Sequence, residues 1–237
     1  MTFFASSLTG AAIIAVPALD RRNVDRLTDV TMATLFASYP ILFSAVMAFS
    51  EGIRHQTVDE LLYRVDRSLG LDVFSWMHVV WGHHWLYVFL CTAYMTLPIL
   101  IALGWVLERS TTMLRAMSIA PVLAGVIYYL VPAVGPIHAF TPDTPHTVLS
   151  MNALANLPRN CFPSMHLGWA LLVALNARTR GWKMVAWIFT VLTAMATIGL
   201  GVHYYVDLLA AVPFCFAVQR LALCQFGKRP IHEGSLT

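Results

Sequence analysis

The residues His203-Tyr204-Tyr205-Val206-Asp207 stand at the start of a long apolar run, 205–223, near the C-terminus. Asp207 is the only acidic residue between positions 144 and 232. A buried carboxylate is costly unless something pairs with it, so an ionisable residue in an apolar segment is a candidate for a functional site. His203 lies four residues earlier, which makes the two side chains neighbours if the segment is helical. The spacing predicts a carboxylate that orients an imidazole.

A second stretch, Phe162-Pro163-Ser164-Met165-His166, opens another apolar run at 164–177. Proline is favoured at or just before a helix start and serine is a good capping residue, so a helix is predicted to begin at Ser164. The first N–H groups of this helix would form an anion site. Arg159 is the only arginine in 134–163 and could add a two-pronged contact to a phosphate.

The composition indicates an integral membrane protein. The 237 residues are 58% hydrophobic and 11% charged, whereas a soluble domain has about 25% charged residues. The apolar runs are continuous, which favours helices. The net charge of +3 is modest and gives no indication of nucleic-acid binding. The runs fall near 3–19, 30–50, 85–107, 116–133, 164–177, 184–202 and 205–223.

These runs predict an all-α integral membrane protein. The chain divides into an N-terminal apolar segment with a basic loop (1–29), a membrane-embedded domain (30–223) and a tail (224–237). The first run, 3–19, could span the membrane, enter it partway or pack on its surface.

Basic residues predict the orientation of the bundle. If every run spans, one side holds eleven basic residues and the other holds four, so the C-terminus is expected in the cytoplasm. His166, His203 and Asp207 would then lie at the external end. The richer side holds Arg21, Arg22, Arg26, Arg109, Arg115, Arg178, Arg180, Lys183, Arg220, Lys228 and Arg229. The other side holds Arg54, Arg64, Arg67 and Arg159.

The segment 57–71, TVDELLYRVDRSLGL, differs from the apolar runs. It places Val58, Leu61, Leu62, Val65 and Leu69 on one helical stripe, with acids and arginines elsewhere. This pattern predicts an amphipathic helix in the membrane interface. Such a helix could seal the end of the bundle or guide an amphiphilic substrate.

Together, the anion site, two histidines and a carboxylate are what phosphoryl transfer through a covalent histidine requires. Two histidines and a carboxylate could also bind a metal, or serve as helix–helix hydrogen-bond partners. The anion-seeking surround of Ser164 and Arg159 argues against a cation, so neither a metal nor another cofactor is expected. Inert buried thiols are expected at the four cysteines, which are Cys91, Cys161, Cys215 and Cys224.

The stretches 161–166 and 201–207 resemble the second and third signature motifs, P-S-x-H and H-x-x-x-D, of the phosphatidic-acid phosphatase type 2 superfamily. The branch that contains yeast-type inositol phosphorylceramide synthase is also similar at 62–67 (LYRVDR) and 132–136 (PAVGP). The resemblance covers roughly residues 55–220 and implies a six-helix transmembrane core.

The resemblance implies a role for each motif residue. His203 would be the nucleophile that forms a phosphohistidine, and Asp207 its orienting partner. His166 would be the general acid and Ser164 a phosphate ligand.

Two phosphate-binding cations of the superfamily are missing. The first motif, K-x6-R-P, is absent because 128–136 contains no basic residue. The arginine usual six residues before the nucleophile is Thr197 here. Arg159, Arg64 or Arg67 could take over this role.

The expected function is that of a metal-independent enzyme of the inner or plasma membrane. It would act at the external leaflet on a membrane lipid phosphate or phosphodiester. Water as acceptor would make it a phosphatase, and a hydroxyl would make it a phosphotransferase such as the inositol phosphorylceramide type. A proton-coupled transporter is the non-enzymatic alternative, and it predicts inverted repeats that the sequence does not show. The oligomeric state stays open.

Overall fold

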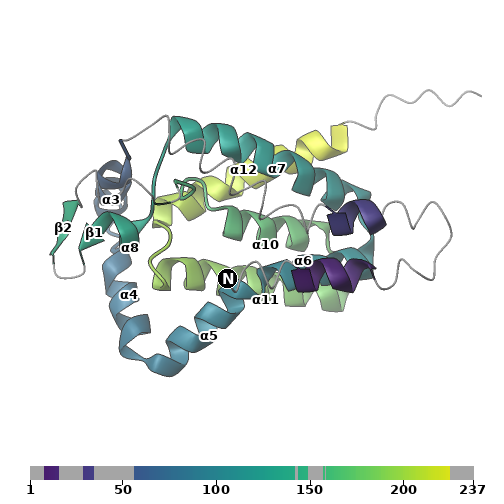
Figure 1. Cartoon of the computed structure of the whole chain (residues 1–237), viewed down its shortest axis with the longest axis horizontal. Coiled ribbons are helices and arrows are strands. Elements are labelled where there is room, and N and C mark those ends of the chain that lie inside the picture. Colours follow the sequence, from purple (N-terminus) through teal and green to yellow (C-terminus); the bar gives the residue numbers. More distant parts are fainter. Residues whose placement is uncertain are drawn as a thin grey trace, which may run out of the picture.

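The computed structural model describes residues 8–15, 29–34, 56–141, 144–148, 157 and 159–224. These residues form an elongated bundle of helices with a short two-stranded ribbon at one end (Figure 1). The strands β1 (Phe140–Thr141) and β2 (Thr144–Val148) pair antiparallel, which an all-α prediction did not include. A strand of two residues leaves no alternating pattern to read in a sequence. The predicted runs 3–19 and 30–50 lie largely outside the described residues.

The helix α10 (Met165–Asn176) occupies the centre of the bundle. It packs against α6 (Leu97–Glu108), α7 (Thr111–Leu130), α11 (Arg180–Gly199) and α12 (Tyr205–Cys224), as Figure 1 shows. Ten of its twelve residues are buried. A helix that is apolar all round suits such a central position, and this accounts for the short run predicted at 164–177.

Within the part of the chain that the structure describes, three helices are long and apolar enough to cross a membrane, namely α7, α11 and α12. A fourth span results if α5 (His84–Met95) and α6 are counted together, although they meet at an angle of 46°. Pro98 stands in the first turn of α6, where the missing N–H of proline is tolerated. The predicted run 85–107 is thus a bent pair of helices, and the six-span core stays a prediction.

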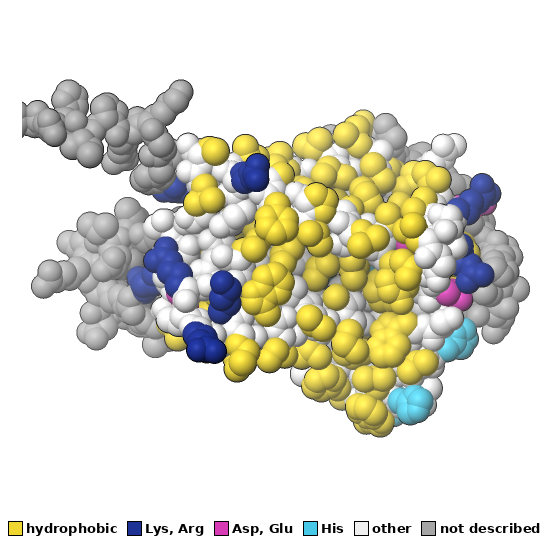
Figure 2. All heavy atoms as spheres, turned by 180° about the vertical axis from the view of Figure 1, so that it is seen from behind, with side chains coloured by type: hydrophobic (Ala, Val, Ile, Leu, Met, Phe, Trp, Pro, Cys, Tyr) yellow, Lys and Arg dark blue, Asp and Glu magenta, His cyan; other side chains and the backbone are white. Residues whose placement is uncertain are grey.

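The surface of the bundle carries a band of hydrophobic side chains (Figure 2). Large exposed hydrophobic residues lie on every long helix except α10, including Val122 on α7, Ile188 on α11 and Leu209 on α12. Figure 2 shows Lys and Arg at one end of this band, and acids and histidines with further basic residues at the other. A belt of apolar surface between polar ends is typical of an integral membrane protein.

The helices α3 (Asp59–Ser68), α4 (Val73–Gly82) and α8 (Pro136–Ala139) cluster with the ribbon at one end of the bundle (Figure 1). The helix α3 is amphipathic, as predicted, but its buried face is formed by Asp59, Leu62, Tyr63 and Asp66. Leu61 and Leu69, which were predicted to share the apolar stripe, are 59% and 56% exposed. The stripe is confirmed only in part, since Leu62 is buried and Val58 and Val65 are half-buried, whereas two carboxylates of α3 also point inward.

The turn 132–136 connects the segments that meet at this end of the bundle. The Pro132 carbonyl accepts from the N–H of Val58, and the Ala133 carbonyl accepts from the N–H of Cys161. Gly135 has a φ of +90°, and a Cβ at this position would lie 2.5 Å from the carbonyl oxygen of Val202. Only glycine fits this approach without strain, so the turn can contact the loop that precedes His203.

Candidate active site

His203 lies in the connection between α11 and α12, and Asp207 lies in the first turn of α12. The His203 Nδ1 is 3.3 Å from the Asp207 Oδ2, and both side chains are buried. The structure therefore brings the predicted pair together. The helix begins only at Tyr205, so the two side chains meet across a helix start and not on one helix face.

The turn that carries His203 is anchored to Thr197. The backbone N–H groups of Val202 and His203 both donate to the Thr197 carbonyl, at 3.1 and 3.3 Å. The Thr197 hydroxyl donates to the carbonyl of Ala194. Thr197 stands where the superfamily named above usually carries an arginine, and in this chain it supports the backbone of the turn.

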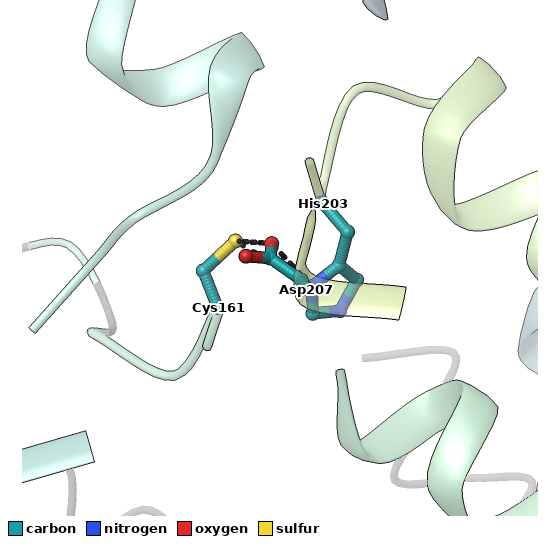
Figure 3. A group of neighbouring side chains, drawn as sticks. All are labelled: Cys161, His203 and Asp207. Atoms are coloured by element: carbon teal, nitrogen blue, oxygen red, sulfur yellow. Dashed lines mark hydrogen bonds and ion pairs between the residues drawn. The ribbon is translucent and has the colours of Figure 1, made fainter. Parts of the chain in front are cut away.

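Cys161 completes the group around Asp207 (Figure 3). Its Sγ lies 2.7 Å from the Asp207 Oδ2, to which the thiol donates, and 3.4 Å from the His203 Nδ1. Burial and the nearby charge of Asp207 raise the pKa of the Cys161 thiol well above its ordinary value. Cys161 is buried as expected, but it also belongs to the site. Its position directly before the motif that starts at Phe162 was the sequence feature that could have indicated this.

The Cys161 Sγ, the His203 Nδ1 and the Asp207 carboxylate are also the atoms that could hold a metal ion, since they lie within 4.8 Å of one another. In this structure, however, the Cys161 thiol donates its proton to Asp207, and a metal ion would have to displace that proton. The Asp207 Oδ2 accepts from the thiol and from the N–H of Tyr204, at 2.7 and 2.8 Å. The observed hydrogen bonds suit an imidazole that is oriented by a carboxylate.

His166, the second residue of α10, faces the same region. Its ring centroid lies 6.2 Å from that of His203. The ring stacks on Tyr94 of α5 at a centroid distance of 4.0 Å, and the Tyr94 hydroxyl is 3.2 Å from the His166 Nδ1. When this hydroxyl donates to Nδ1, the proton of the neutral imidazole resides on Nε2. Tyr94 was not predicted as a site residue, because nothing in its local sequence distinguishes it from other membrane tyrosines.

Ser164 is the N-cap of α10, as predicted, and its hydroxyl oxygen accepts from the Leu167 N–H. Its own N–H is not available to an anion, because it donates to the Asp207 carbonyl at 3.2 Å. This corrects the expectation of a free N–H at Ser164. The hydrogen bond instead ties the start of α10 to the start of α12, which brings His166 and His203 to the same end of the bundle.

The three candidate arginines lie in different surroundings. Arg159 is fully buried, two residues before Cys161. Arg64 is exposed and forms an ion pair with Glu60, and Arg67 is exposed and pairs with Asp72 at 3.2 Å. The structure thus places Arg159 in the interior beside the site segment, whereas in the described part of the chain Arg64 and Arg67 pair with Glu60 and Asp72 and not with His166 or His203.

Two further acids of α3 contact the site segment, although the amphipathic pattern predicts them on the polar face of the helix. Asp59 accepts from the Tyr204 hydroxyl at 2.9 Å, and Asp66 accepts from the N–H groups of Tyr205 and Val206 at 2.8 Å. Burial raises the pKa of Asp66 to about 6, and the two N–H groups oppose this shift. The spacing of seven residues on one helix face was the signal that sequence reasoning missed.

A helical membrane protein with a buried histidine–carboxylate pair and a second histidine nearby is the class that this fold and site define. The chain belongs to the PAP2 superfamily, whose family model matches residues 60–221. The members of this superfamily are generally phosphatases or phosphotransferases, which supports an enzyme. The match spans α3 and both histidine stretches. A search of curated proteins found no match, and a search of solved structures found none either.

Proposed function

We propose that the protein is a membrane-embedded enzyme that removes or transfers the phosphate-bearing headgroup of a membrane lipid through a phosphohistidine at His203. Superfamily membership supports a phosphatase or phosphotransferase in general. The observation that carries the proposal is the hydrogen-bonding distance of 3.3 Å between the His203 Nδ1 and the Asp207 Oδ2. With the imidazole proton on Nδ1 donated to Asp207, the Nε2 lone pair would be left to attack phosphorus.

His166 is the proposed general acid. In an in-line reaction the nucleophile stands about 3 Å from phosphorus, and the acid stands about 2.8 Å from the leaving oxygen. The two nitrogens are therefore roughly 6–7 Å apart, which is similar to the ring separation of 6.2 Å. As an imidazolium, His166 would donate its Nε2 proton to the departing lipid oxygen while His203 attacks, and its Nδ1–H would donate to the Tyr94 hydroxyl; a neutral imidazole remains. The neutral imidazole could then accept the proton of the water or hydroxyl that attacks the phosphohistidine.

The phosphate is proposed to bind at the start of α10, next to Arg159. The N–H of Met165 belongs to the first turn of α10, where backbone donors have no partner within the helix. The buried guanidinium of Arg159 would supply the charge that the missing superfamily cations provide elsewhere. Arg64 and Arg67, which are exposed, are more distant candidates for contacts with the headgroup.

The site is proposed to face the external or lumenal side, with the C-terminus in the cytoplasm and no metal or other cofactor in the reaction. The excess of basic residues at the opposite ends of the helices supports this orientation. An apolar groove of about 500 Å³ lies between α4, α11 and α12, and is lined by Trp76, Met195 and Leu209 among others. Such a groove next to the start of α12 suits the acyl chain of a lipid substrate.

Water and a hydroxyl are both candidate acceptors. Hydrolysis needs no second binding site, so we favour a phosphatase, with a headgroup transferase of the inositol phosphorylceramide type as the alternative. The stretch 62–67, which resembles that branch, is held at the site through Asp66. The resemblance of this stretch is what supports the alternative.

The test is to incubate purified protein with a panel of lipid phosphates and phosphodiesters, with and without inositol, sugars and ceramide as acceptors. Released phosphate reports a phosphatase, and new lipid products report a transferase. His203→Ala should abolish turnover, and Asp207→Asn should lower kcat by about 10⁴-fold if the carboxylate orients the imidazole as in other triads. His84→Ala changes an exposed histidine of α5 and serves as the control. Turnover that persists in His203→Ala would refute the proposed mechanism.

A further inference from the structure

The buried face of α3 presents two carboxylates to the catalytic end of the bundle. Asp59 and Asp66 are both 0% exposed, although α3 is a short helix at the edge of the bundle. Burying a carboxylate costs free energy unless hydrogen bonds replace its hydration. Asp59 and Asp66 do accept such bonds, from donors in two segments, 132–136 and 204–206.

Asp66 caps α12 from a different helix. Its two oxygens accept from the N–H groups of Tyr205 and Val206, both at 2.8 Å. These are the first two residues of α12, and first-turn N–H groups have no partner within their own helix. A negative charge at this position also interacts favourably with the helix dipole. The residue before the helix, Tyr204, is not of a capping type, and its hydroxyl donates to Asp59 instead.

Asp59 holds the neighbouring backbone. It accepts from the N–H groups of Val134 and Gly135, at 3.1 and 2.9 Å, and from the Tyr204 hydroxyl at 2.9 Å. Tyr204 is fully buried, and it is the residue that directly follows His203. Asp59 therefore holds the side chain of the residue that follows His203, and Asp66 holds the backbone of the next two residues.

Three consecutive N–H groups at the start of α12, those of residues 204–206, donate to carboxylates. The N–H of Tyr204 donates to the Asp207 Oδ2, and those of Tyr205 and Val206 donate to Asp66. Asp207 sits on this same turn and lies 3.3 Å from the His203 Nδ1. A shift of the turn would change that distance directly, and misplacing a reacting group by 1 Å can lower a rate by about 100-fold.

We infer that Asp59 and Asp66 of α3 are positioning residues that hold the first turn of α12 so that Asp207 can orient His203. This inference rests on the proposed function. Neither residue touches the reacting atoms, since their contacts end on the backbone of 134–135 and 205–206 and on the Tyr204 hydroxyl. The helix α3 is thereby part of the catalytic apparatus and more than a seal at the membrane interface.

The test compares Asp66→Asn, Asp66→Glu and Tyr204→Phe in full-length protein, with Glu60→Gln as the matched control. Glu60 is an acid of the same helix that faces outward and pairs with Arg64. An asparagine retains the shape of Asp66, but its NH₂ group faces one of the two N–H donors. Asp66→Asn should lower kcat by about 10–100-fold while KM changes by less than about two-fold. Asp66→Glu should recover part of kcat, because a carboxylate is restored.

Tyr204→Phe removes a single hydrogen bond to Asp59 and should lower kcat by about 3–10-fold. If Asp66→Asn does not fold, the kcat of Tyr204→Phe tests the positioning role. Wild-type kcat in both variants, or a loss that appears in KM alone, would overturn the inference. So would a loss of kcat that only follows a fall in Tm and that Asp66→Glu does not recover. His203→Ala, measured alongside, separates the two ideas, because an inactive His203→Ala with a fully active Asp66→Asn refutes only the positioning role.

Discussion

Replacing Gly135 by alanine should destabilise the protein more than any comparable glycine change near the site. Gly135 has φ +90° and ψ 158°, a region that is essentially restricted to glycine. Such backbone strain costs about 1–3 kcal/mol. The added Cβ would also lie 2.5 Å from the Val202 oxygen and 3.0 Å from its carbonyl carbon. Overpacking of this kind costs about 1–3 kcal/mol more.

The two contributions add to about 4 kcal/mol as a central value. For a chain of this size, 1 kcal/mol corresponds to about 2–4 °C in Tm, so Gly135→Ala should lower Tm by roughly 8–16 °C. The assay is thermal unfolding of purified protein in detergent, followed by tryptophan fluorescence. Activity should fall as well, because Val202 directly precedes His203 in the chain.

Two other glycines provide matched controls. Gly70 has φ +74° but nothing within 4 Å of an added Cβ, so Gly70→Ala should cost only about 1–2 kcal/mol. Gly82, the last residue of α4, has open space and no positive φ, and its replacement by alanine should not lower Tm. An equal fall in Gly70→Ala and Gly135→Ala, or a Tm within about 2 °C of wild type in Gly135→Ala, would refute the reasoning.

His166→Ala should slow the release of a lipid alkoxide far more than that of a nitrophenolate, because acid assistance matters most for basic leaving groups. An equal loss on both substrates would assign His166 to phosphate binding. Arg159→Ala should lower kcat/KM by about ten- to a hundredfold, and Arg159→Lys should recover only part, since lysine cannot make a two-pronged contact. Normal kinetics in Arg159→Ala would contradict phosphate binding by Arg159 and would favour Arg64 or Arg67 for that role. Activity should persist in EDTA and be inhibited by vanadate, whereas loss in EDTA that Zn²⁺ or Mg²⁺ restores would contradict a metal-free reaction. Burial raises the pKa of Asp66 to about 6, so the folded state binds this proton more tightly than the unfolded chain. The contribution of Asp66 to stability is therefore complete below about pH 4 and is lost as the pH rises through about 6, and the Tm of wild type should fall relative to Asp66→Asn over that interval.

Much of the helical framework was predictable from local features of the chain. The runs 184–202 and 205–223 correspond closely to α11 and α12, because a continuous apolar run of that length is itself the signal for a membrane helix. The cap at Ser164 was equally local, since the capping side chain and the N–H that it accepts from are three residues apart. The pairing of His203 with Asp207 followed from a separation of four residues.

The face that α3 turns inward was not predictable in this way. Its hydrophobic pattern favours Leu61 and Leu69, yet the structure buries Asp59 and Asp66. A carboxylate is buried only where hydrogen-bond donors are present, and the donors to Asp59 and Asp66 lie far along the chain. Tyr204, for example, lies 145 residues from Asp59.

The sequence by itself therefore determined the class of protein, its long helices and the two histidine stretches, because composition, apolar periodicity and short spacings are properties of neighbouring residues. The tertiary structure alone decided that Cys161, Tyr94 and the acids of α3 join the site. It also decided that the Ser164 N–H donates to the Asp207 carbonyl. Each of these contacts links segments that are distant in sequence, and their hydrogen bonds form only when the packed helices bring donor and acceptor together.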